Sequence, residues 1–190
     1  MKVFFSSSRR GRQYFDHYFW MISKYLDKMG YENINSELMD TNNKEFFKEM
    51  EESGPKFFSK TYQSLIKKVI VSDIAIFECS LHSLSIGFLI EKALELNKPV
   101  IVLYLKEHLP DFLAGIQDEK FQIVEYSEEN LEEKLSNAIL KARNLMEKRF
   151  NFFISPTLLT YLNKAAKENG ITKSTFIRNL ILDDMKKSQM

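Results

Sequence analysis

The chain has a single cysteine, Cys79, among its 190 residues. One cysteine excludes an internal disulfide and any cysteine-rich zinc site. Its three histidines, His17, His82 and His108, lie far apart and without the spacing of metal ligands. The sequence therefore predicts no metal site and implies no cofactor.

Long apolar runs are also missing. No run approaches the roughly 20 residues that a membrane-spanning helix needs. The N-terminal stretch MKVFFSSSRRGR places its basic residues after a short apolar patch, which is the reverse of a secretory signal. We therefore expect a cytoplasmic protein with no membrane partner.

The composition is that of an ordinary globular protein, with 44% hydrophobic and 28% charged residues. This length allows one domain of about 145 residues and a small appendage. The net charge of +1 hides an asymmetry, because residues 141–190 hold ten Lys and Arg against four Asp and Glu, whereas the preceding 140 residues hold seventeen against twenty-two. The basic C-terminal part makes nucleic acid a candidate partner, and an unevenly solvated surface is the alternative.

Short apolar strands alternate with helical patterns over the first 147 residues. Helical stripes run through Phe15–Met29, Tyr62–Ile70, Ile86–Leu94 and Leu131–Met146, and residues 36–54 are interpreted as a polar, variable excursion. This alternation predicts an α/β fold with a doubly wound, five-stranded parallel sheet in the flavodoxin-like order 2-1-3-4-5. The expected strands are residues 2–5, 31–35, 73–77, 100–104 and 121–126.

In that strand order, the loops after the first and third strands meet at a crevice beyond the carboxyl ends of the sheet. The first loop suits a phosphate, because hydroxyl, guanidinium and turn amide groups all donate hydrogen bonds to an anion. There is no Walker sequence and no GxGxxG motif, so a solvated turn is the alternative. The candidate phosphate ligands are Ser6, Ser7, Ser8, Arg9, Arg10 and Gly11, with Ser83 and Ser85 on the other side.

Two stretches, FFSSSRRGR and SDIAIFECSLHSLSIGFLIEKALELNKPVIVLY, resemble the nucleoside 2-deoxyribosyltransferase superfamily over residues 2–126. Within it, the 2'-deoxynucleoside 5'-monophosphate N-glycosidases are the most similar branch. The resemblance implies that the crevice binds a molecule like a nucleoside 5'-monophosphate. The residues on motif positions are Ser8, Arg10, Gly11, Asp73, Glu78, Ser83 and Gly87.

The departures from the family pattern bear on catalysis. Leu89 stands where the family has its catalytic glutamate, Phe4 replaces an active-site tyrosine, and Leu65 replaces an aspartate. Glu91, two residues beyond Leu89, should face away from the crevice, which leaves Glu78 as the carboxylate of any active site. We therefore expect a catalytically degenerate nucleotide-binding domain. The alternative is an active N-glycosidase or deoxyribosyltransferase.

The segment after residue 147 predicts one strand and two helices. Residues 148–155 alternate in polarity, Ser155-Pro156 starts a helix that ends at Asn169-Gly170, and Thr172-Lys173-Ser174 starts another. About 40 residues are too few for an independent core, so a second copy must complete it. This segment resembles a ribbon-helix-helix domain over residues 148–187, which implies a homodimer.

The same resemblance implies contacts with double-stranded DNA. Arg149, Asn151 and Phe153 would enter the major groove from the paired strands, and the amides near Lys173 and Ser174 would hold a phosphate. The alternative is a dimerisation module that never touches DNA. The sequence thus predicts two domains, residues 1–147 and 148–190, in a ligand-responsive DNA-binding regulator; a scaffold or antitoxin-like partner protein without a ligand is a third possibility.

Overall fold

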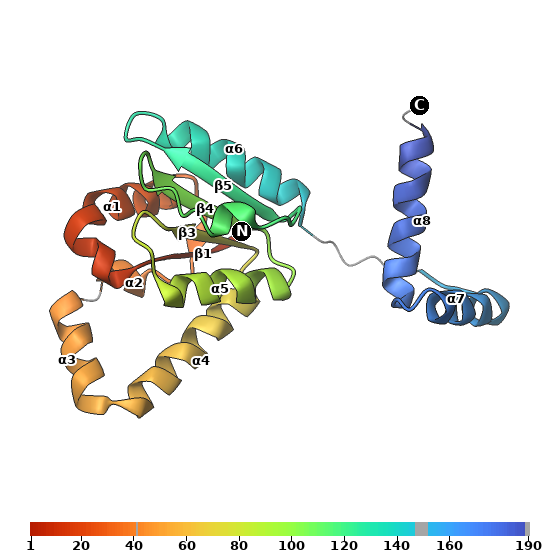
Figure 1. Ribbon diagram of the computed structural model, residues 1–190, viewed down its shortest axis with the longest axis horizontal. Coiled ribbons are helices and arrows are strands. Elements are labelled where there is room, and N and C mark those ends of the chain that lie inside the picture. Colours follow the sequence, from red (N-terminus) through yellow and green to blue (C-terminus); the bar gives the residue numbers. More distant parts are fainter. Residues whose placement is uncertain (41, 147–151, 189–190) are drawn as a thin grey trace. The chain divides into compact units, whose positions relative to one another are not determined.

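The computed structural model describes residues 1–40, 42–146 and 152–188. The chain divides into two compact units, unit 1 (Met1–Glu147) and unit 2 (Lys148–Met190). Unit 1 contains the sheet with the helices around it, and unit 2 contains two helices (Figure 1).

Unit 1 is built on a five-stranded sheet in the order β2-β1-β3-β4-β5. Every neighbouring pair of strands is parallel. The predicted fold class and strand order are therefore confirmed. The strands are β1 (Lys2–Ser7), β2 (Glu32–Asn33), β3 (Ile74–Glu78), β4 (Val100–Leu105) and β5 (Phe121–Tyr126).

Helices cover both faces of the sheet, with α1 and α6 on one face and α4 and α5 on the other (Figure 1). No described helix is both long and apolar enough to cross a membrane. The helices are α1 (Arg12–Lys28), α2 (Glu37–Asp40), α3 (Asn43–Ser53), α4 (Pro55–Val71), α5 (Leu84–Glu95) and α6 (Leu131–Asn144), with short 3-10 turns η1 (Arg9–Gly11) and η2 (Leu113–Gly115).

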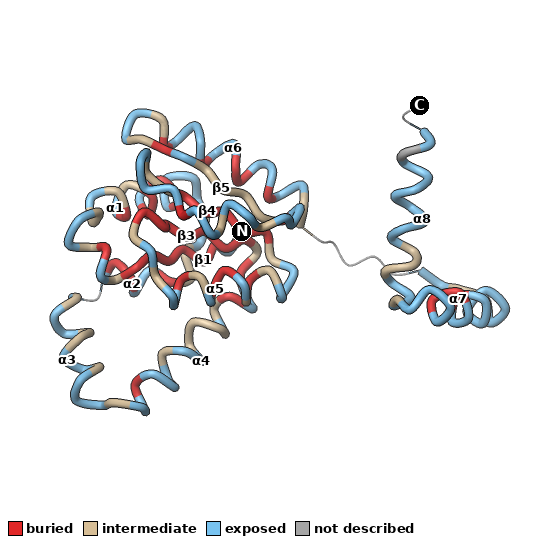
Figure 2. The backbone as a smooth tube through the Cα atoms, viewed as in Figure 1, coloured by how far each residue is buried: buried red, intermediate tan, exposed pale blue. Residues whose placement is uncertain are grey.

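The central strands are buried because both faces of the sheet are covered. Figure 2 shows the buried residues concentrated in these strands, and every residue of β3 is among them. Side chains alternate between the two faces: Val3 and Phe5 pack on the side of α1 and α6, and Phe4 packs on the side of α4 and α5. This alternation decides which way each polar residue at the strand ends points.

Two segment assignments made from the sequence are wrong. Ser6 and Ser7 belong to β1 rather than to the loop after it, because they lie in register with Phe77 and Glu78 of β3. Residues 36–54 are largely helical, in α2 and α3, and the Asn42 side chain caps α3 by accepting a hydrogen bond from the Lys44 amide. The many acidic residues of this segment obscured the pattern of a capped amphipathic helix.

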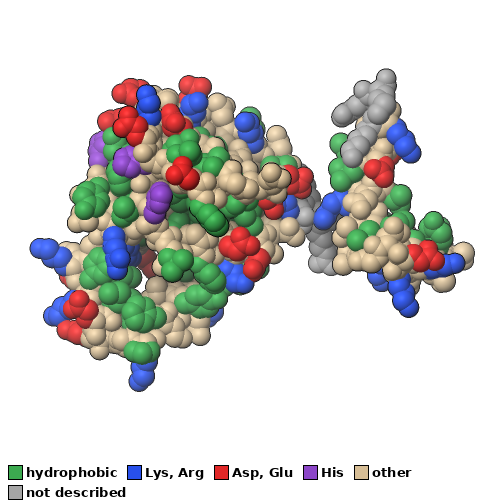
Figure 3. Space-filling model, viewed as in Figure 1, with side chains coloured by type: hydrophobic (Ala, Val, Ile, Leu, Met, Phe, Trp, Pro, Cys, Tyr) green, Lys and Arg blue, Asp and Glu red, His purple; other side chains and the backbone are tan. Residues whose placement is uncertain are grey.

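The apolar helix faces expected from the sequence include terminal residues that are exposed in the structure. Met29 is exposed because it follows the last residue of α1 and precedes Gly30, whose φ of +71° ends the helix. On α4, Tyr62 and Ile70 are also exposed. Figure 3 shows hydrophobic side chains at the surface over α4 and α5, where the Tyr62 ring lies 5.9 Å from that of Phe88.

Unit 2 is a helical hairpin of α7 (Pro156–Glu168) and α8 (Lys173–Ser188). The Ser155 hydroxyl accepts a hydrogen bond from the Leu158 amide at 3.3 Å, as expected for an N-cap. Gly170, with a φ of +65°, ends α7. The predicted start and end of the first helix and the predicted start of the second are therefore confirmed.

Unit 2 buries few side chains and exposes many apolar ones. Its buried side chains are Leu162, Ala165 and Ala166. The expected strand is not formed over residues 152–155, since a lone strand has no backbone partner, and Arg149, Phe150 and Asn151 lie outside the described residues. The exposed large apolar residues are Phe152, Phe153, Leu158, Leu159, Tyr161, Leu180, Ile181, Leu182 and Met185.

Candidate functional site

The carboxyl ends of β1 and β3 lie side by side, with Ser7 in register with Glu78. The loops that follow also meet. A Cβ atom on Gly11 would lie 3.3 Å from the Phe19 ring and 3.5 Å from the Leu81 Cβ. A Cβ at position 11 would therefore crowd the Phe19 ring of α1, whereas its distance from Leu81 is an ordinary van der Waals contact between the two loops.

Four serines and one carboxylate are buried at this edge. Each of them is at most 7% exposed: Ser6, Ser7, Ser8, Ser80 and Glu78. By the alternation along the strands, Ser7 and Glu78 point to the same face of the sheet, toward α1 and α6. Their side chains share one buried polar region.

Glu78 is hydrogen-bonded through only one of its two carboxylate oxygens. Its Oε1 accepts hydrogen bonds from the Tyr126 hydroxyl at 3.2 Å, from the Ser80 amide at 3.3 Å and from the Ser80 hydroxyl. Its Oε2 is buried and has no hydrogen-bond partner in the described structure. Burial raises the pKa of Glu78 to about 7, although the hydrogen bonds from Ser80 and Tyr126 lower it.

Most of the buried side-chain atoms that lack hydrogen-bond partners lie near this edge. Within the described part of the chain there are five such atoms, and four of them belong to the ends of β1 and β3, to the turn after β1 or to the start of α3. The fifth belongs to Asn33, which lies in register with Val3 near the amino end of β1. Unpaired buried polar atoms are rare and each costs about 1–3 kcal/mol. The carboxyl-edge cluster comprises Ser7 Oγ, Arg9 Nη1, Asn43 Oδ1 and Glu78 Oε2.

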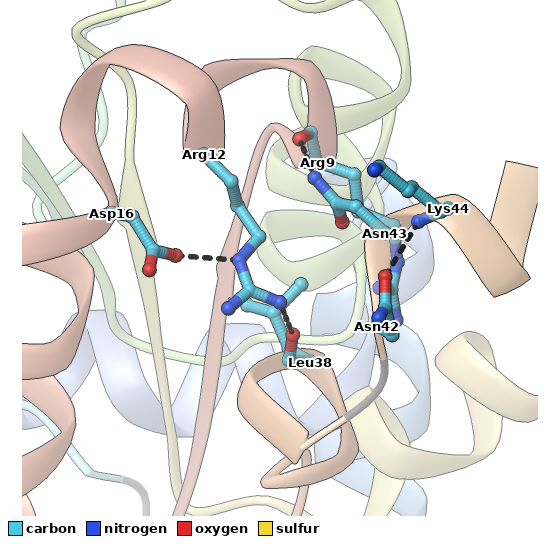
Figure 4. Close-up of polar contacts among 7 residues, drawn as sticks. All are labelled: Arg9, Arg12, Asp16, Leu38, Asn42, Asn43 and Lys44. Carbon is cyan, nitrogen blue, oxygen red and sulfur yellow. Dashed lines mark hydrogen bonds and ion pairs between the residues drawn. The ribbon is translucent and has the colours of Figure 1, made fainter.

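Arg9 is fixed in place by α3 (Figure 4). Its guanidinium lies 4.0 Å from the centroid of the Phe46 ring, and its carbonyl accepts a hydrogen bond from Asn43 Nδ2 at 2.8 Å. Burial lowers the pKa of Arg9, and the nearby charge of Arg12 lowers it further. Both effects disfavour the charged guanidinium, so an anion at this position would stabilise it.

The other predicted phosphate ligands differ in exposure. Arg10 and Ser85 are exposed, and Ser83 and Gly87 are half-buried. Ser83 precedes the first residue of α5, but its hydroxyl makes no capping hydrogen bond. The first amides of α5 therefore receive no capping hydrogen bond from the Ser83 side chain.

The motif residue Asp73 lies away from this edge. It precedes β3 at the amino edge of the sheet, where its Oδ2 accepts a hydrogen bond from the Lys2 amide at 2.7 Å. Leu89 and Phe4, which stand at expected catalytic positions, are buried together in the apolar cluster between the sheet and α5, and Leu65 packs against that cluster. These three side chains fill core space on the face opposite Glu78.

Sequence analysis missed several residues of the site. Asn43 and Tyr126 lie in segments that carried no motif, and Phe46 lies in the segment that was interpreted as a polar excursion. Next to Asn43 is a cavity of about 430 Å³, in which Arg12 pairs with Asp16 at 2.6 Å (Figure 4). It is lined by Arg12, Gln13, Asp16, Met39, Asp40, Asn42 and Asn43.

Some predicted residues can be placed only in part. Phe153, Lys173 and Ser174 of unit 2 are exposed, whereas Arg149 and Asn151 lie outside the described residues. In the part of the chain that the structure describes, no group of three or more His, Cys, Asp or Glu side chains is arranged to hold a metal ion.

Comparison with known proteins identifies a similar fold. No protein-family model and no curated protein matches the chain. The solved structure of the CMP N-glycosidase BcmB from Clostridium botulinum matches with a TM-score of 0.51 and 15% sequence identity, over 72% of this chain and 98% of that chain. The two proteins share an α/β fold, and at this identity the likeness extends to the fold alone.

The raised pKa of Glu78 makes stability depend on pH. In the unfolded chain the carboxyl ionises near its ordinary value of 4.5, whereas in the folded protein it keeps its proton up to about pH 7. The free energy of unfolding should therefore fall as pH rises from about 4.5 to above 7, by on the order of 3 kcal/mol from this group. Urea unfolding of Glu78→Gln across this range should lose that part of the pH dependence. The exposed Glu91→Gln should keep it, and an unchanged pH dependence in Glu78→Gln would contradict the assignment.

Proposed function

We propose that the chain is a dimeric, ligand-responsive DNA-binding regulator whose unit 1 binds a nucleoside 5'-monophosphate at the carboxyl edge of the sheet. One observation carries the ligand part of this proposal: the carboxyl-edge cluster contains four buried polar atoms without hydrogen-bond partners. Hydroxyl, guanidinium, amide and carboxyl groups are together suited to a ligand with both phosphate and hydroxyl groups. The fold shared with a CMP N-glycosidase supports this ligand class.

The phosphate is assigned to the turn after β1. Arg9 supplies a charge and Ser8 a hydroxyl, and η1 leads directly into α1 without a capping side chain on Gly11. Backbone amides at a helix start and an arginine form a favourable phosphate site. Ser83, at the start of α5, is assigned to the opposite side of the same ligand.

Binding without hydrolysis is proposed because of Leu89 and Phe4. Both are buried in the apolar cluster with Phe77 and Ile86. Cleavage of an N-glycosidic bond needs a carboxylate near the anomeric carbon, and leucine cannot supply one.

A second candidate is an active N-glycosidase or deoxyribosyltransferase, and Glu78 favours it. A buried carboxyl with a pKa of about 7 and an oxygen without a partner is suited to donate a proton to a departing base. In this case unit 2 would serve only for dimerisation.

Unit 2 is assigned to dimerisation and DNA binding. Its hairpin buries Leu162, Ala165 and Ala166 and leaves a large apolar surface exposed, which a second copy would cover. Pairing of residues 148–155 between two chains would direct Arg149, Asn151 and Phe153 toward the major groove. Lys173 and Ser174, at the start of α8, would hold a DNA phosphate.

The ligand assignment predicts binding of nucleoside 5'-monophosphates to the full-length protein. Isothermal calorimetry with each common ribo- and deoxyribonucleoside 5'-monophosphate should detect at least one binder. Arg9→Ala should weaken it roughly tenfold to a hundredfold, because a charge-assisted hydrogen bond is lost. Lys24→Ala, on the exposed face of α1, is the control and should change nothing. The absence of heat and of thermal stabilisation with every nucleotide would rule out the assignment.

The apolar residues at the catalytic positions predict no hydrolysis. Purified protein incubated with deoxynucleosides or their monophosphates should release no free base above the background without protein, as measured by chromatography. Enzyme-dependent release that Glu78→Gln abolishes would instead establish the second candidate.

The C-terminal assignment predicts that dimerisation and DNA binding are lost together. Deletion of residues 148–190 should leave a folded unit 1 with weaker self-association in sedimentation and no affinity for a randomised DNA pool at low salt. Joint replacement of Arg149 and Asn151 by alanine should keep the dimer and remove sequence preference. Lys173→Ala should weaken binding evenly across sequences.

The dependence on salt provides a separate check. The logarithm of the DNA affinity should fall with the logarithm of salt concentration, with a slope of about −0.9 per phosphate contacted. Lys24→Ala, in unit 1, should leave this slope unchanged. A full-length protein that sediments as a monomer, or a dimer that shifts no DNA, would contradict the assignment.

A further inference from the structure

Helix α3 differs from the other helices around the sheet in how it is held. None of its residues is buried (Figure 2). At its C-terminal end it turns into α4 at Gly54, whose φ is +51°, and the Phe46 ring packs 5.0 Å from that of Phe57 on α4. The α3–α4 hairpin therefore extends from the sheet with little apolar anchoring of its first helix (Figure 1).

Two contacts join α3 to the loop after β1, and both involve Arg9. The Arg9 guanidinium stacks over Phe46, 4.0 Å from the centroid of the ring. The Arg9 carbonyl accepts a hydrogen bond from the side-chain amide of Asn43 at 2.8 Å (Figure 4). Arginine has many rotamers, and stacking on a ring restricts the plane of its guanidinium. Stacking on Phe46 therefore restricts the directions in which the N–H donors of Arg9 can point.

The same two residues also carry atoms without partners. Arg9 Nη1 and Asn43 Oδ1 are buried and make no hydrogen bond in the described structure. Arg12, which lies close enough to lower the pKa of Arg9, adds a like charge. An anion bound at Arg9 would pair with Nη1 and offset this repulsion, so it would stabilise the arrangement in which α3 rests on the loop.

We propose that Phe46 and Asn43 are positioning residues for Arg9, and that α3 is a cap whose docking on the loop after β1 and nucleotide binding strengthen each other. This inference rests on the proposed function and names how its ligand site is controlled. Coupling of this kind is reciprocal: if the docked α3 raises the affinity for nucleotide, bound nucleotide stabilises the docked α3 by the same factor. The coupling should depend on the phosphate of the ligand, because the phosphate is the group that we assign to Arg9.

The test uses the full-length protein and the common nucleoside 5'-monophosphates, with the matching nucleosides as probes without phosphate. Phe46→Leu keeps apolar volume and removes the ring, so it should weaken nucleotide binding about fivefold or more in calorimetry. Phe46→Trp should restore the affinity, and nucleoside binding should not respond to either change. Phe58→Leu on α4 is the matched control and should behave as the native protein.

Hydrogen exchange gives an independent readout. Addition of a nucleotide that binds should slow exchange of the amides in residues 43–53, and it should do so less in Phe46→Leu. A nucleotide could bind equally well to the native protein and to Phe46→Leu, with no change of exchange in residues 43–53. This result would contradict the proposed coupling of α3 to the ligand site and leave the proposed function standing. If no nucleotide binds the native protein, both fail.

Discussion

The pairing of β1 with β3 is the constraint on which the rest of unit 1 depends. Five residues of each strand lie in register, from Val3 with Ile74 to Ser7 with Glu78, so both strands end at the same level. The chain then leaves β1 and β3 toward different helices, and no strand lies between their ends. Parallel pairing alone therefore brings two loops together that are about 70 residues apart in sequence.

Much of this arrangement could be predicted because the relevant signals are local and periodic. The apolar run in β3 and the helical spacing of Phe19, Ile22 and Leu26 determine the elements, and right-handed crossovers leave few topologies for five such units. Convergence of the two serine-containing loops follows from the strand order. The lengths of strands were harder to predict, since Ser6 and Ser7 extend β1 only because β3 supplies their backbone partners.

The rest of the site could not be predicted because it depends on contacts between distant segments with no shared pattern. Glu78 with Tyr126, and Arg9 with Phe46, pair residues that only the folded chain brings together. The acidic residues of α3 concealed Phe46, whose ring stacks on the Arg9 guanidinium. The strand expected in residues 148–155 would need a backbone partner from outside this segment, and no pattern within the segment can supply or test one.

The two faces of the sheet differ chemically near its carboxyl edge. The difference suggests a role for the buried polar atoms of Ser7 and Glu78. On the side of α4 and α5, Phe4 and Leu89 pack into an apolar core. On the side of α1 and α6, Ser7 and Glu78 are just as deeply buried, yet each keeps an atom without a partner. Apolar residues of similar volume would remove that penalty, as they do on the opposite face. The polar atoms therefore weaken the unliganded fold, and a ligand that hydrogen-bonds to them would recover stability in proportion to its binding free energy.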